Sequence, residues 1–169
     1  MNFLFNKAFN DYITEFHEKR DYFECHEIME DAWKEKEHYT KQDPEVALIM
    51  LATGLYHLRR HNVKGAIILL NKTIDMMQLN KTFLSHYLEI DNVIQSIQEL
   101  IIKQTYQSIN LPLVSRITFK HPQSISEEIL HKHKLRDRTD VILSRQWALN
   151  NKYPVQNTPD KTHHANEAE

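Results

Sequence analysis

The sequence predicts an all-α protein, and three observations support this class. It contains only two glycines and five prolines, too few for the tight turns of a sheet protein. Leucine, isoleucine, glutamate, lysine, glutamine and asparagine dominate its long uninterrupted stretches. Apolar residues recur every three or four positions, as they do on one face of a helix. We expect a compact bundle of about five core helices, arranged as two packed helical hairpins, with extra helices and a C-terminal helical extension.

The first two helices are predicted from periodicity and from a start signal. Residues 3–20 carry aromatic and aliphatic side chains at helical spacing. Asp21 precedes Glu24 by three residues, which is a capping-box pattern, and no glycine or proline interrupts the chain before Lys36. We therefore expect one helix that ends near residue 20 and a second helix that begins at Asp21.

The third and fourth helices also have recognisable beginnings. The Asp-Pro-Glu run at residues 43–45 places a capping carboxylate, a first-turn proline and an acid where a helix prefers them. The helix that follows, to about Arg60, is apolar almost all the way round, which predicts a central buried position. Asn62 is expected to cap a fourth helix that reaches about residue 79.

The rest of the chain alternates between helical and extended patterns. A short helical piece is expected at residues 83–88, and Asp91 is expected to cap a fifth long helix. Residues 111–119 are β-branched and broken by a proline, which predicts an extended segment lying over the bundle. Ser124 and Glu127 form a capping-box pattern for a last helical region that reaches about residue 149.

A chain of 169 residues is long enough for one domain with a substantial core and short for two. We expect a helical bundle domain over residues 1–110. The extended segment and the C-terminal helix, residues 111–150, are expected to pack on or beside this bundle. The polar residues 151–169 have little to bury, so a disordered tail is predicted there.

Composition and charge exclude several classes of partner. A single cysteine excludes an intramolecular disulfide, and Cys25 falls on the apolar face of its helix, as expected in a reducing compartment. We expect a cytoplasmic protein without a signal peptide or membrane contact, because the most apolar run, residues 46–58, is too short to span a bilayer. A pI near 6.6 argues against nucleic acid, and the basic cluster at residues 131–138 is typical of a solvated helix face. The expected partner is another protein or a second copy of this chain.

The second helix carries the residues with the strongest functional pattern. His26, Glu27 and Glu30 form the zinc-protease pattern with its second histidine replaced by glutamate. His26 and Glu30 lie one turn apart on one face, and His57 from the next helix is a candidate third metal ligand. Glu27 occupies the position of a general base. The candidate functional cluster is His26, Glu27, Glu30, Trp33, His57 and Arg60.

Two classes of function remain open for these residues. The preferred one is an interaction or scaffold module without a cofactor, in which His26, Glu30 and His57 form a hydrogen-bond network between the second and third helices. The alternative is a metal- or anion-binding, hydrolase-like enzyme centred on these residues and Glu27, with a divalent metal such as zinc. Arg60 is expected to cap the end of its helix. The functional alternative is that Arg60 reaches the acidic face of the second helix, as an ion-pair partner or as an anchor for an anionic ligand.

Two motifs in this region carry a family resemblance. They are residues 22–27 with Glu30 and Trp33, followed by residues 55–60 and an Asn62-x-x-Gly65-Ala66 helix start. This combination resembles the family called domain of unknown function 309, over about residues 5–80. The resemblance implies a small all-helical bacterial or archaeal protein and no established activity. This chain has Cys25 where members often have alanine and His61 where glycine is common.

Overall fold

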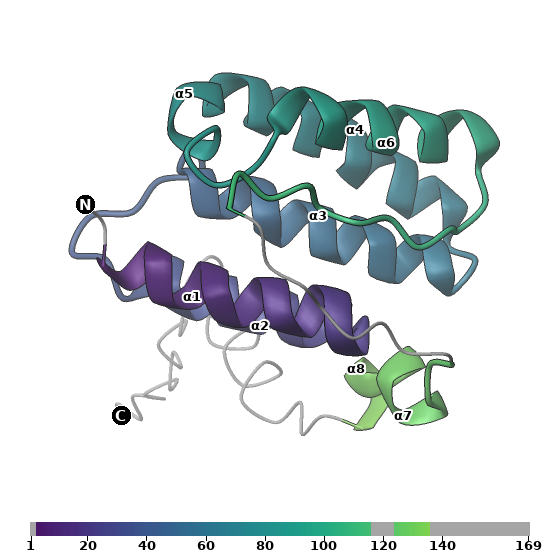
Figure 1. Ribbon diagram of the computed structural model, residues 1–169. Coiled ribbons are helices and arrows are strands. Elements are labelled where there is room, and N and C mark those ends of the chain that lie inside the picture. Colours follow the sequence, from purple (N-terminus) through teal and green to yellow (C-terminus); the bar gives the residue numbers. More distant parts are fainter. Residues whose placement is uncertain (1–2, 116–123, 136–169) are drawn as a thin grey trace, which may run out of the picture. The chain divides into compact units, whose positions relative to one another are not determined.

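Helices form most of the described chain, which covers residues 3–115 and 124–135 of the computed structural model (Figure 1). Between extended segments, the only pairing in this part of the chain is an isolated antiparallel bridge from Leu88 to Leu113. The predicted all-α class is confirmed. None of the described helices is long and apolar enough to cross a bilayer. The elements are α1 (Phe3–Thr14), a π-helical continuation (Glu15–Lys19), α2 (Tyr22–Lys34), α3 (Pro44–Arg59), α4 (Val63–Leu79), α5 (Lys81–Leu84), α6 (Ile90–Lys103), α7 (Glu127–Leu130) and α8 (Lys132–Leu135).

The helices stack in layers, with α3 in the middle (Figure 1). The first hairpin, α1 with α2, covers one side of α3. Helix α4 covers the other side of α3, and α6 packs against α4. This is the predicted arrangement of two packed hairpins. Helix α3 packs against α2 on one side and against α4 on the other. This position explains why α3 is apolar almost all the way round. Its buried residues are Glu45, Val46, Ala47, Leu48, Leu51, Ala52, Gly54, Leu55, Tyr56, Leu58 and Arg59.

Two of the predicted helix starts are confirmed by capping hydrogen bonds. The Asp21 carboxylate accepts a hydrogen bond from the Glu24 backbone N–H at 3.0 Å, at the beginning of α2. The Asn62 side-chain oxygen accepts one from the Gly65 N–H at 3.2 Å, at the beginning of α4. Each cap satisfies a backbone donor that has no partner inside its helix.

Other starts differ from the prediction in detail. Asp43 does precede α3, but its carboxylate accepts from the Thr40 N–H instead of capping the helix. The N-cap of α6 is Glu89, two residues before the predicted Asp91, because the buried Ile90 belongs to the helix and its packed face. Likewise Ser126, two residues beyond the predicted Ser124, caps α7. The short piece predicted at residues 83–88 corresponds to α5, which begins two residues earlier, at Lys81, and already ends at Leu84.

The segment after α6 returns across the bundle in an extended conformation, as predicted. The backbone N–H of Leu111 donates to Nε2 of the buried His17 at 3.0 Å, which ties the segment to the end of the first helix. Two backbone hydrogen bonds, from Glu89 to Pro112 and from Val114 to Tyr87, fasten it beside the start of α6. The rest of the predicted extended segment, the helical region after residue 135 and the tail at 151–169 lie outside the described residues, so the domain boundaries remain predictions.

The turn between α3 and α4 needs a left-handed backbone. His61 has φ of 63° there, and its N–H donates to the Leu58 carbonyl at 3.1 Å. A left-handed residue with a Cβ is less stable than glycine at such a helix end. This explains in backbone terms why glycine is common at this position in the family that the sequence resembles.

Candidate functional site: a pocket between α2, α3 and α8

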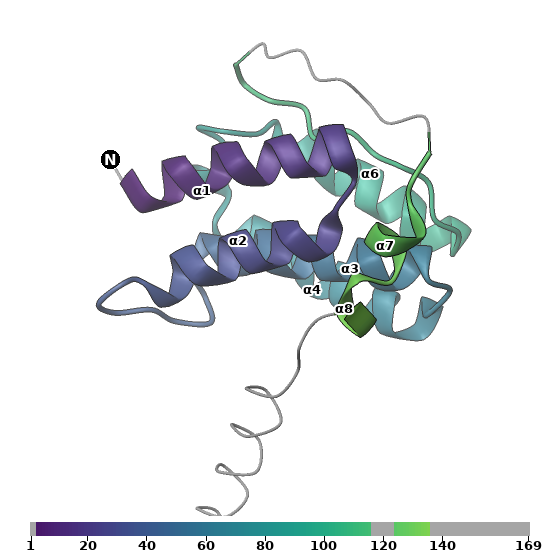
Figure 2. The same cartoon turned by 90° about the horizontal axis from the view of Figure 1, so that it is seen from below.

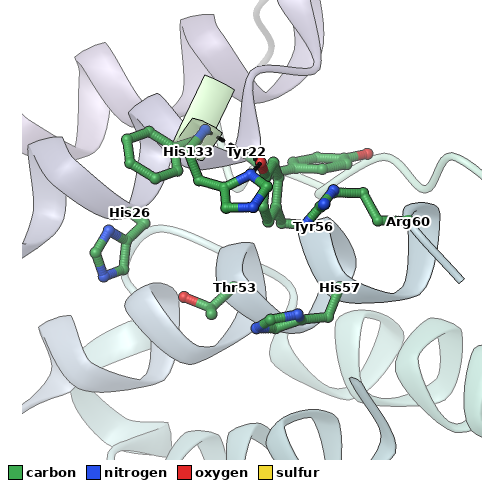
Figure 3. Close-up of a pocket in the computed structure, with 8 residues that line it drawn as sticks. Tyr22, His26, Thr53, Tyr56, His57, Arg60 and His133 are labelled. Atoms are coloured by element: carbon green, nitrogen blue, oxygen red, sulfur yellow. Dashed lines mark hydrogen bonds between the residues drawn. The ribbon is translucent and has the colours of Figure 1, made fainter. Parts of the chain in front are cut away.

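Side chains of α2, α3 and α8 line a partly open pocket of about 240 Å³, which we call the α2–α3 pocket (Figure 3). Each lining side chain of α3 lies three or four residues from two of the others, so these side chains share one face of the helix. On α2, His26 lies one turn after the neighbouring Tyr22 and Phe23. No carboxylate belongs to the lining. The lining residues are Tyr22, Phe23, His26, Thr53, Tyr56, His57, Arg60 and His133.

Among the residues that the structure describes, the Arg60 guanidinium has no partner of opposite charge. It lies 5.4 Å from the centre of the Tyr56 ring, and its buried Nε has no hydrogen-bond partner among the described residues. The ion pair expected between Arg60 and the acidic face of α2 is not formed. Two acids of that face have other partners instead, since Glu24 pairs with Lys132 and Glu30 pairs with Lys34. Its buried Nε is an unsatisfied donor, and the half-buried guanidinium has no ion pair among the described residues, so an anion in the pocket would be favourable.

His57 lines the pocket as a neutral imidazole. Its Nδ1 lies 3.1 Å from the Asn62 side-chain nitrogen, which can only donate, so Nδ1 accepts and the proton sits on Nε2. Burial lowers the pKa of His57, and the positive charge of Arg60 lowers it further. At neutral pH this side chain therefore offers a hydrogen-bond donor and no charge.

His26 bridges two carboxylates of its own helix. Its Nδ1 lies 3.0 Å from Glu27 and its Nε2 lies 3.2 Å from Glu30, whose other oxygen is 2.5 Å from Lys34. In the part of the chain that the structure describes, His26, Glu27 and Glu30 are the only group of three potential metal ligands with ligand atoms within 4.8 Å.

His57 does not join this group, so the predicted metal triad of His26, Glu30 and His57 is not assembled. The predicted hydrogen-bond network of His26, Glu30 and His57 between the second and third helices is also corrected: His26 contacts Glu27 and Glu30 of its own helix, and His57 contacts Asn62. The physical reason is that the Asn62 cap engages the His57 ring, whereas the α2 carboxylates lie within one turn of His26.

Trp33 lies outside the pocket and has a structural role. Its indole Nε1 donates to the Thr40 carbonyl at 2.9 Å, and its ring contacts Tyr39 with centroids 4.8 Å apart. These contacts hold the connection between α2 and α3. Of the candidate cluster, the structure therefore brings His26, His57 and Arg60 to one pocket and places Trp33 elsewhere.

The roof of the pocket comes from α8, near the beginning of α2 and the end of α3 (Figure 2). His133 Nδ1 lies 2.5 Å from the Tyr56 hydroxyl. Lys132 lies 2.7 Å from the buried Asp21 carboxylate and 3.0 Å from Glu24. Burial by itself lowers the pKa of Lys132, but the hydrogen bonds and charges of these two acids outweigh it and raise the pKa to about 12.

Sequence reasoning missed this contribution of α8. The sequence predicts a solvated helix face for residues 131–138. In the structure Lys132 pairs with Asp21, which lies 111 residues earlier in the chain. No local pattern encodes such a distant pairing. The pocket residues on α2 and α3 did carry a signal, because Phe23, Thr53 and Tyr56 lie three or four residues from His26, His57 or Arg60 on the same helices.

Lys132→Met is expected to lower the free energy of unfolding by about 1 to 2 kcal/mol, because the buried Asp21 oxygen loses its cation. Urea unfolding followed by circular dichroism measures the change. The matched control is Lys81→Met, because the Lys81–Asp91 pair has the same 2.7 Å separation but is exposed. The control should lose less than about 0.5 kcal/mol. Equal effects of the two substitutions would contradict a stabilising contact between α8 and α2.

Comparison with known proteins places this site within a family. The model of the domain of unknown function (DUF309) matches residues 9–69, which include every pocket residue of α2 and α3. The uncharacterised protein YpuF of Bacillus subtilis (strain 168) is 37% identical over 164 residues, covering 85% of this chain and 94% of that protein. No solved structure matches the chain. Because the family model covers α2 and α3 and this relative is 37% identical over most of the chain, this chain belongs to the DUF309 family.

Proposed function

We propose that this protein is a cytoplasmic helical interaction module, and that the α2–α3 pocket is its recognition site for an anionic group. The observation that carries the proposal is Arg60, a guanidinium in the pocket wall without an ion-pair partner among the described residues. The cytoplasm is proposed because the buried Cys25 is a free thiol.

The surroundings of Arg60 favour binding of an anion over binding of a cation. None of the eight lining residues is acidic. The neutral His57 ring carries its proton on Nε2, and Thr53 adds a hydroxyl to the same helical face. Hydrogen bonds from such donors to an ionised group are about twice as strong as those between neutral groups. A bound anion would also supply the ion-pair partner that the Arg60 guanidinium lacks among the described residues.

An NMR titration tests the proposal directly. Full-length protein is titrated with phosphate, acetate and benzoate while backbone amide shifts are followed, and the same series is run on Arg60→Met. We expect at least one anion to shift amides around residues 53–60. Arg60→Met should weaken that binding by about tenfold or more, as expected for loss of a hydrogen bond to a charged group.

The matched control is Lys72→Met, which removes one positive charge from an exposed position of α4 away from the pocket lining. This control should bind anions as the wild type does. If no anion binds, or if Arg60→Met and Lys72→Met reduce binding equally, the proposal is wrong, because attraction would then come from overall charge and not from the pocket.

A second candidate function rests on the group formed by His26, Glu27 and Glu30, which is the metal-binding alternative. Its test is a titration of Zn²⁺ and Mn²⁺ into chelator-treated protein while thermal unfolding is followed. A metal site predicts a saturable rise in the melting temperature that His26→Ala and Glu30→Gln both abolish, with His38→Ala as the exposed control. No rise would exclude this candidate and leave the three residues as a polar network that stabilises α2.

A further inference from the structure

We propose that the ligand of the α2–α3 pocket is a small aromatic monocarboxylate, a single ring bearing one carboxylate group. This inference rests on the proposed function, since it specifies which anionic group the pocket recognises. Three properties of the pocket carry it: its charge, the chemistry of its walls and its size.

The pocket offers one permanent positive charge. Arg60 is the only lysine or arginine of the lining. His57 is held neutral by the Asn62 amide, and its pKa is lowered by burial. His26 faces Glu27 and Glu30, so any charge on this ring is compensated on α2. His26 and Arg60 also stand at opposite ends of the group of lining side chains (Figure 3).

A single guanidinium matches a monoanion better than a phosphate dianion. Its planar fork of N–H donors fits the two oxygens of a carboxylate, and one charge balances one charge. A phosphate group carries close to two negative charges at neutral pH and normally draws several cations or a helix N-terminus. The start of α2, beside the lining residue Tyr22, already holds the Asp21 carboxylate, which caps the Glu24 N–H.

The walls of the pocket are largely aromatic. Tyr22, Phe23 and Tyr56 all belong to the lining, and the rings of Phe23 and Tyr56 meet edge to face with centroids 5.9 Å apart. Aromatic rings attract one another in edge-to-face and offset geometries at such distances. A ring entering this space would contact π systems while its substituent reaches Arg60, whose guanidinium lies over the Tyr56 ring.

The size of the pocket matches a single ring. Its volume of about 240 Å³ lies just below the range of about 300 to 1,000 Å³ typical of sites for drug-sized ligands. A nucleotide or a fused polycycle would be too large to be held within this space and would extend into solvent. The contacts of Lys132 and His133 with α2 and α3 hold α8 in place as the roof.

Four probes of similar size separate the contributions of ring and charge. Full-length protein is titrated by NMR with benzoate, cyclohexanecarboxylate, benzamide and phenyl phosphate. We expect benzoate to bind most tightly. Benzamide, which has the same shape without the charge, should bind about tenfold or more weakly. Cyclohexanecarboxylate and phenyl phosphate should each bind several-fold more weakly, the first for lack of a π system and the second for its second charge.

Two variants assign these preferences to residues. Arg60→Met should remove the advantage of benzoate over benzamide. Phe23→Leu keeps the pocket apolar and should reduce the advantage of benzoate over cyclohexanecarboxylate. Lys72→Met should leave both ratios unchanged. Thermal unfolding of each variant shows whether it folds, and if Arg60→Met does not, Arg60→Lys takes its place, because it keeps the charge but loses the planar fork.

The outcomes distinguish this inference from the proposed function. If phenyl phosphate or cyclohexanecarboxylate binds as tightly as benzoate, and the binding depends on Arg60, the pocket is an anion site and the aromatic monocarboxylate inference is overturned. If none of the charged probes shows binding that depends on Arg60, both proposals fail. Binding of benzoate that is strongest in the series and weakened by both Arg60→Met and Phe23→Leu supports both.

Discussion

Replacing Lys36 with methionine is expected to lower the free energy of unfolding by about 3 kcal/mol. Lys36 lies 2.7 Å from Asp43 and 3.2 Å from Glu45, and the Glu45 side chain is only 1% exposed. Removal of the lysine leaves a buried carboxylate without its cation, which is among the costliest single losses in a folded chain. Because Glu45 lies in the first turn of α3, the helix that carries four pocket residues begins at this ion pair.

The control for Lys36→Met is Lys81→Met, which breaks the exposed pair of Lys81 and Asp91 and should cost less than about 0.5 kcal/mol. Chemical unfolding of all three proteins at neutral pH gives the comparison. A loss for Lys36→Met no larger than that of the control would show that the buried Glu45 does not depend on its lysine.

The same substitution should also change the acid dependence of stability. Burial alone raises the pKa of Asp43, but hydrogen bonds from Lys36 and Thr40 outweigh it, so the pKa lies below its ordinary value. A carboxyl whose folded pKa is lowered contributes stability above its unfolded pKa of about 4 and loses it as the pH falls through the folded value. The stability difference between wild type and Lys36→Met should therefore shrink below about pH 4. A constant difference across this range would contradict the assignment to Asp43.

Gly54→Val is expected to destabilise the protein by about 2 to 3 kcal/mol, because α3 and α4 approach closely at this position. A Cβ built on Gly54 would lie 2.9 Å from Cδ2 and 3.1 Å from Cγ of Leu70, which is itself fully buried. The two γ-methyl groups of valine would meet the same side chain and force the helices apart. Chemical unfolding measures the loss.

The control is Gly54→Ala, which adds only the Cβ. The far end of the Leu70 side chain has to give by a few tenths of an ångström, whereas removing a glycine from a helix interior stabilises by about 1 kcal/mol. The two effects should nearly cancel. If Gly54→Val is as stable as Gly54→Ala, the close approach of α3 and α4 is incorrect. Because Thr53 and His57 flank this position, Gly54→Val should also weaken any anion binding in the pocket.

Local sequence rules account for most of the fold. Hydrophobic periodicity predicts the helices, and the caps at Asp21 and Asn62 are where the sequence places them, because a cap needs only a short polar side chain within three residues of a free N–H. The central position of α3 follows from its apolar character all the way round. Where a cap was displaced, as from Asp91 to Glu89, burial of the neighbouring Ile90 decided the helix boundary.

The sequence identified three residues of the pocket, His26, His57 and Arg60, but it did not identify the partners of His57 and Arg60. The i,i+4 spacing brings His26 to Glu30 on α2, and Glu27 is the next residue along the chain. These two contacts of His26 therefore depend on local geometry alone. The spacing within one helix cannot say how that helix is rotated against the next. His57, the predicted third metal ligand, therefore lines the same pocket as His26 but is hydrogen-bonded to Asn62.

The sequence by itself determined the helices, their order and the polar cluster on α2, since these depend on contacts within a few residues. Tertiary structure alone decided that Arg60 faces a pocket in which no described residue supplies a counter-charge, and that Lys132 holds α8 where its His133 lines this pocket. The physical reason is separation along the chain: the Lys132–Asp21 pair joins residues 111 positions apart, and no local propensity encodes which distant charge a side chain will meet once the core has formed.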